Sequence, residues 1–336
     1  MKPVSETQLA LIIPAFRAKY LEESLESIAG QTNQKFNLYV FDDASQEPIQ
    51  EMAQKFQMRQ PLTYHRFSEN LGGRSLPQHW ARCVERTTEP WVWLFSDDDV
   101  MEANCVEALL REIEVTDGSF DLYRFNTQCI DSKSRVVATN DPYPNEEWGR
   151  DFLLVRLLEE RGSTAQELVF SREAWKRVGR FQDYPLAWAV DDVFISEMGG
   201  NKPIRLIPKA RIRWRLSGTN ITSMTTASML SPKIIASRMF IEWVNEFLAD
   251  GTSVKKFTQK ELDAMTEAWF FRWLFFMRTR LALRICLQVD RFASEVWHYP
   301  RGYGLAKCLA WNSRLVFEAI KRRIRSAFRR RKDSQT

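Results

Sequence analysis

Four short apolar runs alternate with four helical patterns over the first 115 residues, and this alternation constrains the fold more than any other feature. The expected strands span residues 8–13, 36–41, 63–67 and 91–95, and the expected helices span residues 20–31, 48–59, 76–86 and 102–115. Strands that are buried on both faces and separated by helices form parallel sheets with helical crossovers. The pattern therefore predicts an α/β fold with a mostly parallel twisted sheet flanked by helices.

The pattern becomes less regular after residue 118. Short strands are expected at residues 122–126, 134–138 and 167–170, with a helix at residues 148–160. Two long helices are then expected, at residues 234–247 and 260–289. We expect an α/β domain over residues 1–228, with halves at 7–118 and 119–228, then a helical extension over 229–312 and a basic amphipathic tail over 313–336.

A polar loop follows each of the first four predicted strands. These loops are residues 14–17, 42–45, 69–74 and 96–99. Ligands of open α/β sheets bind outside the carboxyl ends of the strands. We therefore expect the four loops to converge on one cleft.

Three aspartates, Asp97, Asp98 and Asp99, follow directly after the apolar run at residues 91–95. Adjacent carboxylates repel one another, so the cluster needs solvent, a helix dipole or a cation. A divalent cation is the most specific of these interpretations. The alternative is a helix N-cap, for which Ser96 or a single aspartate suffices.

The glycine patterns that usually bind phosphate, GxxxxGK[ST] and GxGxxG, are missing from the sequence. Their absence argues against a P-loop and against a dinucleotide site. Acidic loops hold a nucleoside diphosphate through a divalent cation, whose coordination they share with the phosphate oxygens. Such a cation also acts as a Lewis acid on a leaving diphosphate.

The order of five motifs resembles that of family 2 glycosyltransferases with the GT-A fold, over about residues 7–225. The motifs are PxF at residues 14–16, DDxS at 42–45, ENxGG at 69–73, SDDD at 96–99 and VDD at 190–192. Each motif is weak alone, but five in this order are specific. The resemblance implies inverting transfer of a sugar from a nucleoside-diphosphate sugar, with UDP as the expected nucleotide. It also makes residues 7–118 the nucleotide-binding half and residues 119–228 the acceptor half.

The resemblance implies roles for residues of the first four motifs. The nucleobase and ribose would contact Pro14, Ala15, Phe16, Asp42 and Asp43, with Asp43 at the edge of the base. The nucleotide side would also include Arg17, Asn70, Gly72, Gly73 and Arg74. Asp97 and Asp98 would bind the sugar nucleotide, and Asp99 with Asp97 would bind Mn²⁺ or Mg²⁺, with Asp99 as the direct ligand. Two alternatives stay open: Asp42 as a helix cap with Ser45, and Gly72-Gly73 as a simple turn.

Inverting transfer needs a general base that takes the proton of the acceptor hydroxyl. The resemblance assigns this role to Asp192, with Asp191 binding the acceptor or orienting the helix. The alternative for Asp191 is a helix N-cap.

The sequence departs from the family pattern at two positions. Arg17 stands where many relatives have asparagine, and we expect it to reach a phosphate. Some relatives place a metal-contacting histidine after the VDD motif, whereas this region contains Arg213, Arg215 and Ser217. A metal with one protein ligand, an arginine contact to the diphosphate and a metal-independent reaction therefore all stay open.

Charge is concentrated at the end of the chain. The formal net charge is +5, but residues 321–336 contain eight Lys and Arg residues and one Asp, so residues 1–320 carry −2. This distribution gives no basis for a nucleic-acid groove across the fold. Apolar residues recur through the tail at helical spacing, which predicts an amphipathic helix on an anionic membrane surface. A solvated or nucleic-acid-binding run is the alternative.

The cellular setting is inferred from cysteine usage and from the tail. Five well-separated cysteines without a CxxC pair fit a reducing compartment, and residues 1–13 do not form a signal peptide. We expect a cytoplasmic enzyme, peripheral on the inner face of the cell membrane, that extends a glycan or lipid-linked acceptor in polysaccharide synthesis, such as lipopolysaccharide. The rivals are an inactive GT-A-like scaffold and a sugar-phosphate nucleotidyltransferase, although the first loop lacks the Gly-rich, basic character of the latter.

Overall fold

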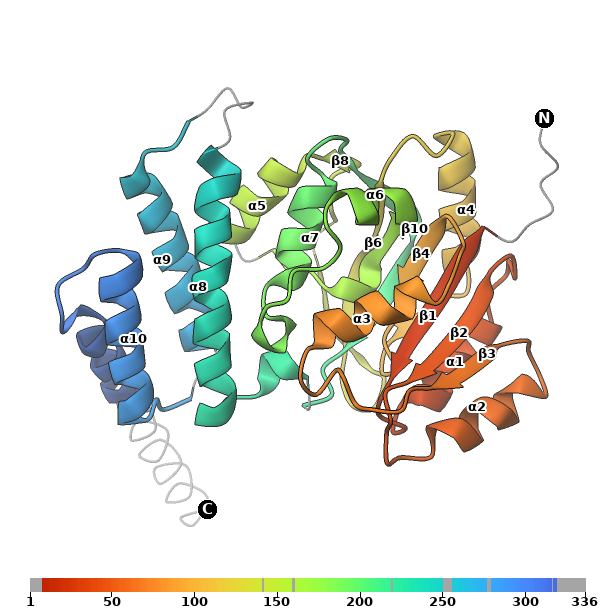
Figure 1. The fold of residues 1–336 in the computed structure, drawn as a ribbon, viewed down its shortest axis with the longest axis horizontal. Helices are drawn as coiled ribbons and strands as arrows, with labels where there is room; N and C mark the ends of the chain where they lie inside the picture. The colour runs from red at the N-terminus through yellow and green to blue at the C-terminus, as the bar shows by residue number, and fades with distance from the viewer. Residues whose placement is uncertain are drawn as a thin grey trace, which may run out of the picture. The chain divides into compact units, whose positions relative to one another are not determined.

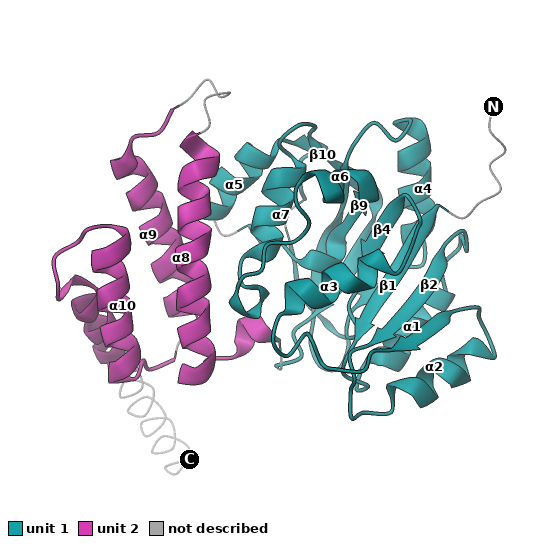
Figure 2. Ribbon diagram, viewed as in Figure 1, with its two compact units in different colours: residues 1–220 teal, residues 221–336 magenta. Residues whose placement is uncertain are grey.

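The computed structural model divides the chain into two compact units, residues 1–220 and residues 221–336 (Figure 2). It describes residues 8–140, 142–158, 161–218, 220–249, 256–276, 279–315 and 317–318. The division lies eight residues before the boundary expected at residue 228. Among the helices in these ranges, none combines the length and the apolar character needed to cross a membrane.

Unit 1 is an α/β domain in which strands and helices alternate along the first 115 residues (Figure 1). Its strands are β1 Leu9–Ala15, β2 Asn37–Asp42, β3 Thr63–Arg66, β4 Trp91–Leu94, β5 Val100–Met101, β6 Leu122–Ile130, β7 Val136–Thr139, β8 Glu146–Glu147, β9 Leu168–Ser171 and β10 Ile204–Arg215. Its α-helices are α1 Leu21–Ala29, α2 Ile49–Gln57, α3 Leu76–Glu85, α4 Cys105–Val115, α5 Gly149–Leu158, α6 Arg172–Arg177 and α7 Val190–Met198. The eight elements expected up to residue 115 are all present.

One sheet runs through unit 1 in the order β3-β2-β1-β4-β9-β6-β10-β5. Strands β3, β2, β1 and β4 are parallel, as predicted, and their carboxyl ends share one edge. The remainder is mixed, because β9 pairs antiparallel with both β4 and β6. The sequence analysis missed β10, in which basic residues alternate with apolar ones and a register shift interrupts the pairing with β6.

Both faces of the parallel half are buried. Alternate residues of β1, such as Leu11 and Ile13, pack with α1, α2 and α4, whereas Ala10 and Ile12 pack in a second core with α3, α6 and α7. A strand buried on both faces cannot place polar groups along its length, so its polar residues collect at its ends. The fold therefore concentrates the chemistry of this half in the loops at the carboxyl edge.

Unit 2 is helical. Its described helices include α8 Ala227–Ala249, α9 Gln259–Phe276 and α10 Leu283–Val296, and residues 303–315 are also helical. The single helix predicted at residues 260–289 is wrong, because α9 and α10 are separate helices. Between them, the backbone N–H and C=O of Leu281 bond to the side chain of Asn312 instead of to a helical neighbour. Most of the predicted amphipathic tail, residues 319–336, lies outside the described residues.

Candidate active site

The loops after β1, β2 and β4 are joined by hydrogen bonds at the carboxyl edge of the sheet. Asp97 Oδ2 accepts from the backbone N–H groups of Phe16 and Arg17, both at 2.9 Å. The Ser45 hydroxyl donates to the carbonyl of Phe16 at 2.6 Å. The loop that contains Phe16 is therefore held from both sides, and these three loops lie together at this edge.

Asp42 is fully buried and fixes the conformation of the loop after β2. Its Oδ1 accepts from the Ser45 N–H at 2.8 Å, while Oδ2 accepts from the Tyr64 hydroxyl at 2.8 Å and from Arg66 at 2.6 Å. These contacts shape a turn and not the helix cap considered from the sequence, because α2 begins at Ile49 after Pro48 without a side-chain cap. Asp42 acts here through the backbone that it fixes.

Asp43 ties the loop after β3 to the end of β2. Its Oδ1 accepts from Leu71 N–H at 2.9 Å, its Oδ2 accepts from Gly72 N–H at 2.8 Å, and Arg82 forms an ion pair with it. A Cβ atom at position 72 would lie 2.6 Å from Asp43 Oδ2, which is why this position requires glycine. Both oxygens of Asp43 take part in contacts within the protein, and its contact with the edge of a base stays a prediction.

The loop over residues 69–74 exposes other predicted groups. Asn70 Oδ1 accepts from the Gly73 N–H at 2.6 Å, and exposed Arg74 pairs with Glu69 at 2.6 Å. Phe16 is 41% exposed, whereas Ala15 is buried and Pro14 and Arg17 are half-buried. Phe16, Gly73 and Arg74 are thus the most accessible of the predicted nucleotide contacts.

The three consecutive aspartates have different surroundings. Asp97 and Asp98 are half-buried, and Asp98 accepts from the Ser96 hydroxyl at 2.6 Å. Asp99 is buried, and its Oδ1 accepts from the Arg215 N–H at 2.7 Å. Burial and the charge of Asp98 raise the pKa of Asp97 to about 6 and raise the pKa of Asp99 well above its usual range. Ionising all three carboxylates together is therefore unfavourable without a compensating charge.

Arg215, at the end of β10, fixes the acidic loop. Its guanidinium is fully buried and donates to the Asp98 carbonyl at 2.6 Å, to Glu23 at 2.7 Å and to the Ser134 hydroxyl at 2.8 Å. It also lies over the ring of Tyr20, 4.3 Å from its centroid. An arginine contact to the diphosphate was one of the possibilities left open by the sequence. Because these contacts occupy its guanidinium, Arg215 supports the acidic loop and does not bind a phosphate.

A divalent cation fits the donor set of the acidic loop in part. Carboxylate oxygens are the ligands that Mn²⁺ and Mg²⁺ prefer, and a cation would relieve the repulsion that raises the pKa values of Asp97 and Asp99. Within the described ranges, however, no three His, Cys, Asp or Glu side chains group closely enough to hold an ion by themselves. A cation would therefore need further oxygens from a ligand.

Asp191 and Asp192 lie in the first turn of α7. Asp192 is buried and forms a two-point ion pair with Arg156 of α5, with Nε–Oδ1 at 2.7 Å and Nη2–Oδ2 at 3.1 Å. Asp191 is half-buried, and burial together with the charge of Asp192 raises its pKa to about 7. The pair therefore combines one carboxylate that is bound by an arginine with one that can gain or lose a proton near neutral pH.

The segment before α7 has unusual backbone geometry. Leu186, Ala187 and Ala189 have φ values of 60°, 52° and 63°, in the left-handed region that residues other than glycine seldom occupy. Such conformations cost about 1–3 kcal/mol each and are found mainly at functional sites. The turn aims the start of α7, and nothing in the residue pattern of this segment predicts it.

A buried ion network lies near the aspartate pair and was also missed from the sequence. Arg124 of β6 pairs with Glu167 at 2.7 Å, and both side chains are buried. The guanidinium of Arg124 lies 3.4 Å from the centroid of the Tyr143 ring. Isolated arginines and glutamates within apolar runs give no sequence signal for such partners, because the partners are far apart in the chain.

Residues 10–165, which include these loops except the one before α7, match the family described as glycosyl transferase family 2. This segment is a family 2 glycosyltransferase domain. The fold of the glycosyltransferase is the GT-A fold, as predicted, followed by C-terminal helices.

The chain is similar to a protein of Streptococcus pneumoniae and to solved structures of S. aureus TarS. It is 24% identical to glycosyltransferase GlyG of Streptococcus pneumoniae serotype 4 over 110 residues, which are 32% of this chain and 36% of that protein. The matched segment thus spans about a third of that relative's length. The crystal structure of S. aureus TarS 1–349 in complex with UDP-GlcNAc has a TM-score of 0.64 at 14% identity, over 94% of this chain and 92% of that one. TarS 1–349 without the ligand gives 0.63 at 13% identity. These structures establish the common fold.

Proposed function

We propose that this glycosyltransferase transfers a sugar from UDP to a glycan or lipid-linked acceptor with inversion at the anomeric carbon, assisted by Mn²⁺ or Mg²⁺. One observation carries the proposal: two carboxylate clusters with complementary properties stand on one α/β scaffold. Asp97 and Asp99 lie beside Asp98 and have raised pKa values, and Asp191, with a pKa of about 7, lies beside Asp192 in the first turn of α7. The likeness of the fold to TarS, whose structure contains UDP-GlcNAc, supports a UDP-sugar donor.

The donor would bind at the loops after β1, β3 and β4. Exposed Phe16 offers a ring face to the uracil, and Gly73 and Arg74 would approach the nucleotide from the opposite loop. Asp97 and Asp99 would hold the cation, each through the oxygen that its backbone contacts leave available. When bound, the cation supplies positive charge to the departing diphosphate.

We propose that the two aspartates of α7 exchange the roles expected from the sequence. A general base must reach the acceptor hydroxyl and be able to change its protonation state near the working pH. Asp192 is buried and bound at both oxygens by Arg156, whereas Asp191 is more exposed and has a pKa of about 7. We therefore assign the base to Asp191 and the orientation of the pair to Asp192.

The acceptor and the cellular location extend the proposal. The region from residue 119 to the end of unit 1 would bind the acceptor, because it contributes Asp191 and the strained turn before it. The basic tail would hold the enzyme on the cytoplasmic face of the membrane. An enzyme on that surface meets a lipid-linked acceptor, as in the synthesis of lipopolysaccharide or another surface polysaccharide.

The test incubates the purified chain and Mn²⁺ with each of a panel of UDP-sugars. A coupled assay measures the UDP that is released. We expect at least one donor to give enzyme-dependent release that EDTA abolishes. Asp117→Asn is the matched control, because it removes an exposed carboxylate in a turn away from the site. If no UDP-sugar releases UDP although the chain still binds free UDP, the result would support the inactive scaffold instead.

A further inference from the structure

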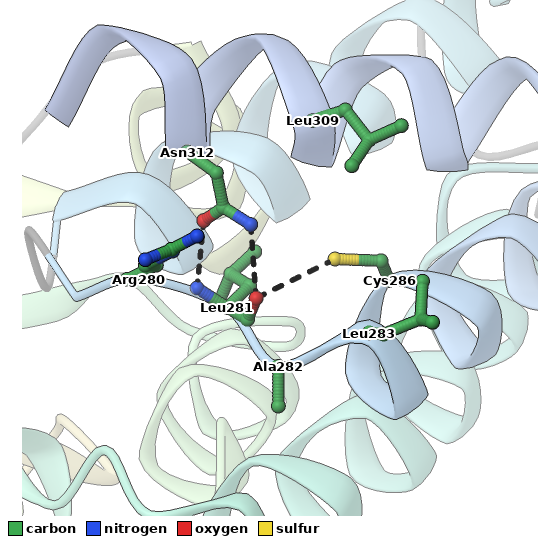
Figure 3. A pocket seen from close by; sticks show the side chains of 7 residues that line it. All are labelled: Arg280, Leu281, Ala282, Leu283, Cys286, Leu309 and Asn312. Carbon is green, nitrogen blue, oxygen red and sulfur yellow. Dashed lines mark hydrogen bonds between the residues drawn. The ribbon is translucent and has the colours of Figure 1, made fainter. Parts of the chain in front are cut away.

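Unit 2 contains an apolar groove between the start of α10 and the helix at residues 303–315 (Figure 3). The groove has a volume of about 420 Å³. Leu281, Ala282 and Leu283 line one side of it, and Leu309 and Asn312 line the other. This site has no part in the proposed transfer reaction.

Polar contacts hold the floor of the groove in place. Asn312 Oδ1 accepts from the Leu281 N–H at 2.8 Å, and Asn312 Nδ2 donates to the Leu281 carbonyl at 2.9 Å (Figure 3). The Cys286 thiol also lies 3.8 Å from that carbonyl. The backbone polar groups of Leu281 are thereby satisfied, so the groove presents a preformed apolar surface.

Large apolar side chains are exposed along both helices that form the groove. Leu283 and Leu287, one turn apart on α10, are 64% and 52% exposed, and Leu309 of the second helix is 48% exposed. Single exposed leucines are ordinary, but several together around one groove mark an interaction surface.

The charge around this surface is positive. Arg280 lines the groove and Arg284 lies between the two exposed leucines of α10; both are exposed. In the part of the chain that the structure describes, neither arginine takes part in an ion pair. The chain then continues from Glu318 into the segment that carries +7 over residues 321–336.

We propose that this groove is a docking surface for an anionic lipid bilayer. Leu283, Leu287 and Leu309 would enter the headgroup region, while Arg280 and Arg284 bind lipid phosphates. The tail itself is a poor occupant, because its positive charge would be repelled by the two arginines. An anionic surface satisfies the apolar and the cationic groups together.

The proposal deepens the membrane location given under the proposed function, and it assigns a folded contact site beside the tail. It does not depend on the transfer reaction. UDP release in solution therefore reports on the enzyme, and vesicle binding reports on the groove.

The test is co-sedimentation of the full-length protein with vesicles of phosphatidylglycerol and phosphatidylcholine, compared with phosphatidylcholine alone. The Leu283→Ser/Leu287→Ser variant should bind anionic vesicles about tenfold more weakly, and Arg280→Gln/Arg284→Gln should also reduce binding. Met58→Ser/Val115→Ser is the matched control, because these side chains are 87% and 70% exposed in unit 1. Its binding should equal that of the wild type.

Circular dichroism and UDP release verify that each variant is folded. Binding of the groove variants at wild-type strength, with binding lost only on truncation after Glu318, would overturn the proposal in favour of the tail alone. Failure of the wild type to bind anionic vesicles would overturn it as well. Equal losses in the control variant would show a nonspecific apolar effect and would also count against it.

Discussion

At the scale of single residues, the site depends on the different surroundings of two adjacent aspartates, Asp191 and Asp192. Arg156 pairs with Asp192 through two contacts, whereas burial, followed by the charge of Asp192, raises the pKa of Asp191. Glu167 also adds negative charge near Asp191. The sequence shows two adjacent aspartates and cannot rank them, because Arg156 lies 36 residues away from Asp192.

The pair gives a pH dependence with a definite sign. The base must be deprotonated, so kcat should rise with pH through about 7, the pKa of Asp191, and level off above it. Arg156→Met removes a positive charge that lowers the pKa of Asp191, so it should shift this rise in kcat to higher pH. Arg177→Met, which removes a different arginine–aspartate pair with Asp121, should leave the rise in place. If Arg156→Met leaves the pH dependence of kcat unchanged, Arg156 does not influence the general base.

Asp99 offers a second test at this scale. Asp99→Asn keeps the shape and the contact with the Arg215 N–H but removes the charge that would attract a cation. We expect Mn²⁺-dependent UDP release to fall by a factor of at least about 100, with an unchanged melting temperature in the absence of Mn²⁺. Near-normal release by this variant with Mn²⁺ present would refute the metal assignment.

At the scale of elements, the sequence determined the parallel half of the sheet better than the mixed half. Strands β1 to β4 are continuous apolar runs that end at polar loops, a local pattern that can be read directly. β10 was missed because its residues alternate between basic and apolar and because its partners β6, β5 and β8 lie far away in the chain. Arg215, the last residue of that strand, was misjudged for the same reason.

Arg215 gives a prediction for this element. Arg215→Met removes a buried guanidinium that holds Asp98, Glu23 and Ser134, which should cost about 3–5 kcal/mol of unfolding free energy. It should also weaken Mn²⁺–UDP binding, measured by calorimetry, because the acidic loop loses its support. Arg205→Met is the control on the same strand, since its ion pairs with Glu112 and Glu146 do not involve the loop. Equal effects on Mn²⁺–UDP binding in both variants would contradict this role.

At the scale of the whole molecule, the chain joins a family 2 glycosyltransferase domain to a helical unit with an apolar, positively charged surface. Composition and charge indicated the basic tail but not the groove. The groove exists because α9 and α10 are separate and because Asn312 binds the backbone between them. No local pattern predicts such a contact across 31 residues.

The structure also refines where the tail can be removed. Truncation after Trp311 would delete Asn312 and disturb the groove, whereas truncation after Glu318 leaves the described helices whole. We expect truncation after Glu318 to move the protein partly from the membrane pellet to the soluble fraction, and high salt to do the same in the intact chain. Unchanged pelleting under both conditions would exclude an electrostatic contribution from the tail.

The central claim is direct displacement of UDP by an acceptor that Asp191 activates, and the anomeric configuration of the product tests it most directly. Proton NMR should follow the reaction of the preferred UDP-α-sugar with wild-type enzyme, recorded before any free sugar mutarotates. We predict a β-configured product, and loss of the reaction by about 10²- to 10⁴-fold in Asp191→Asn with donor binding retained. An α-configured product, or full activity of Asp191→Asn, would contradict the mechanism.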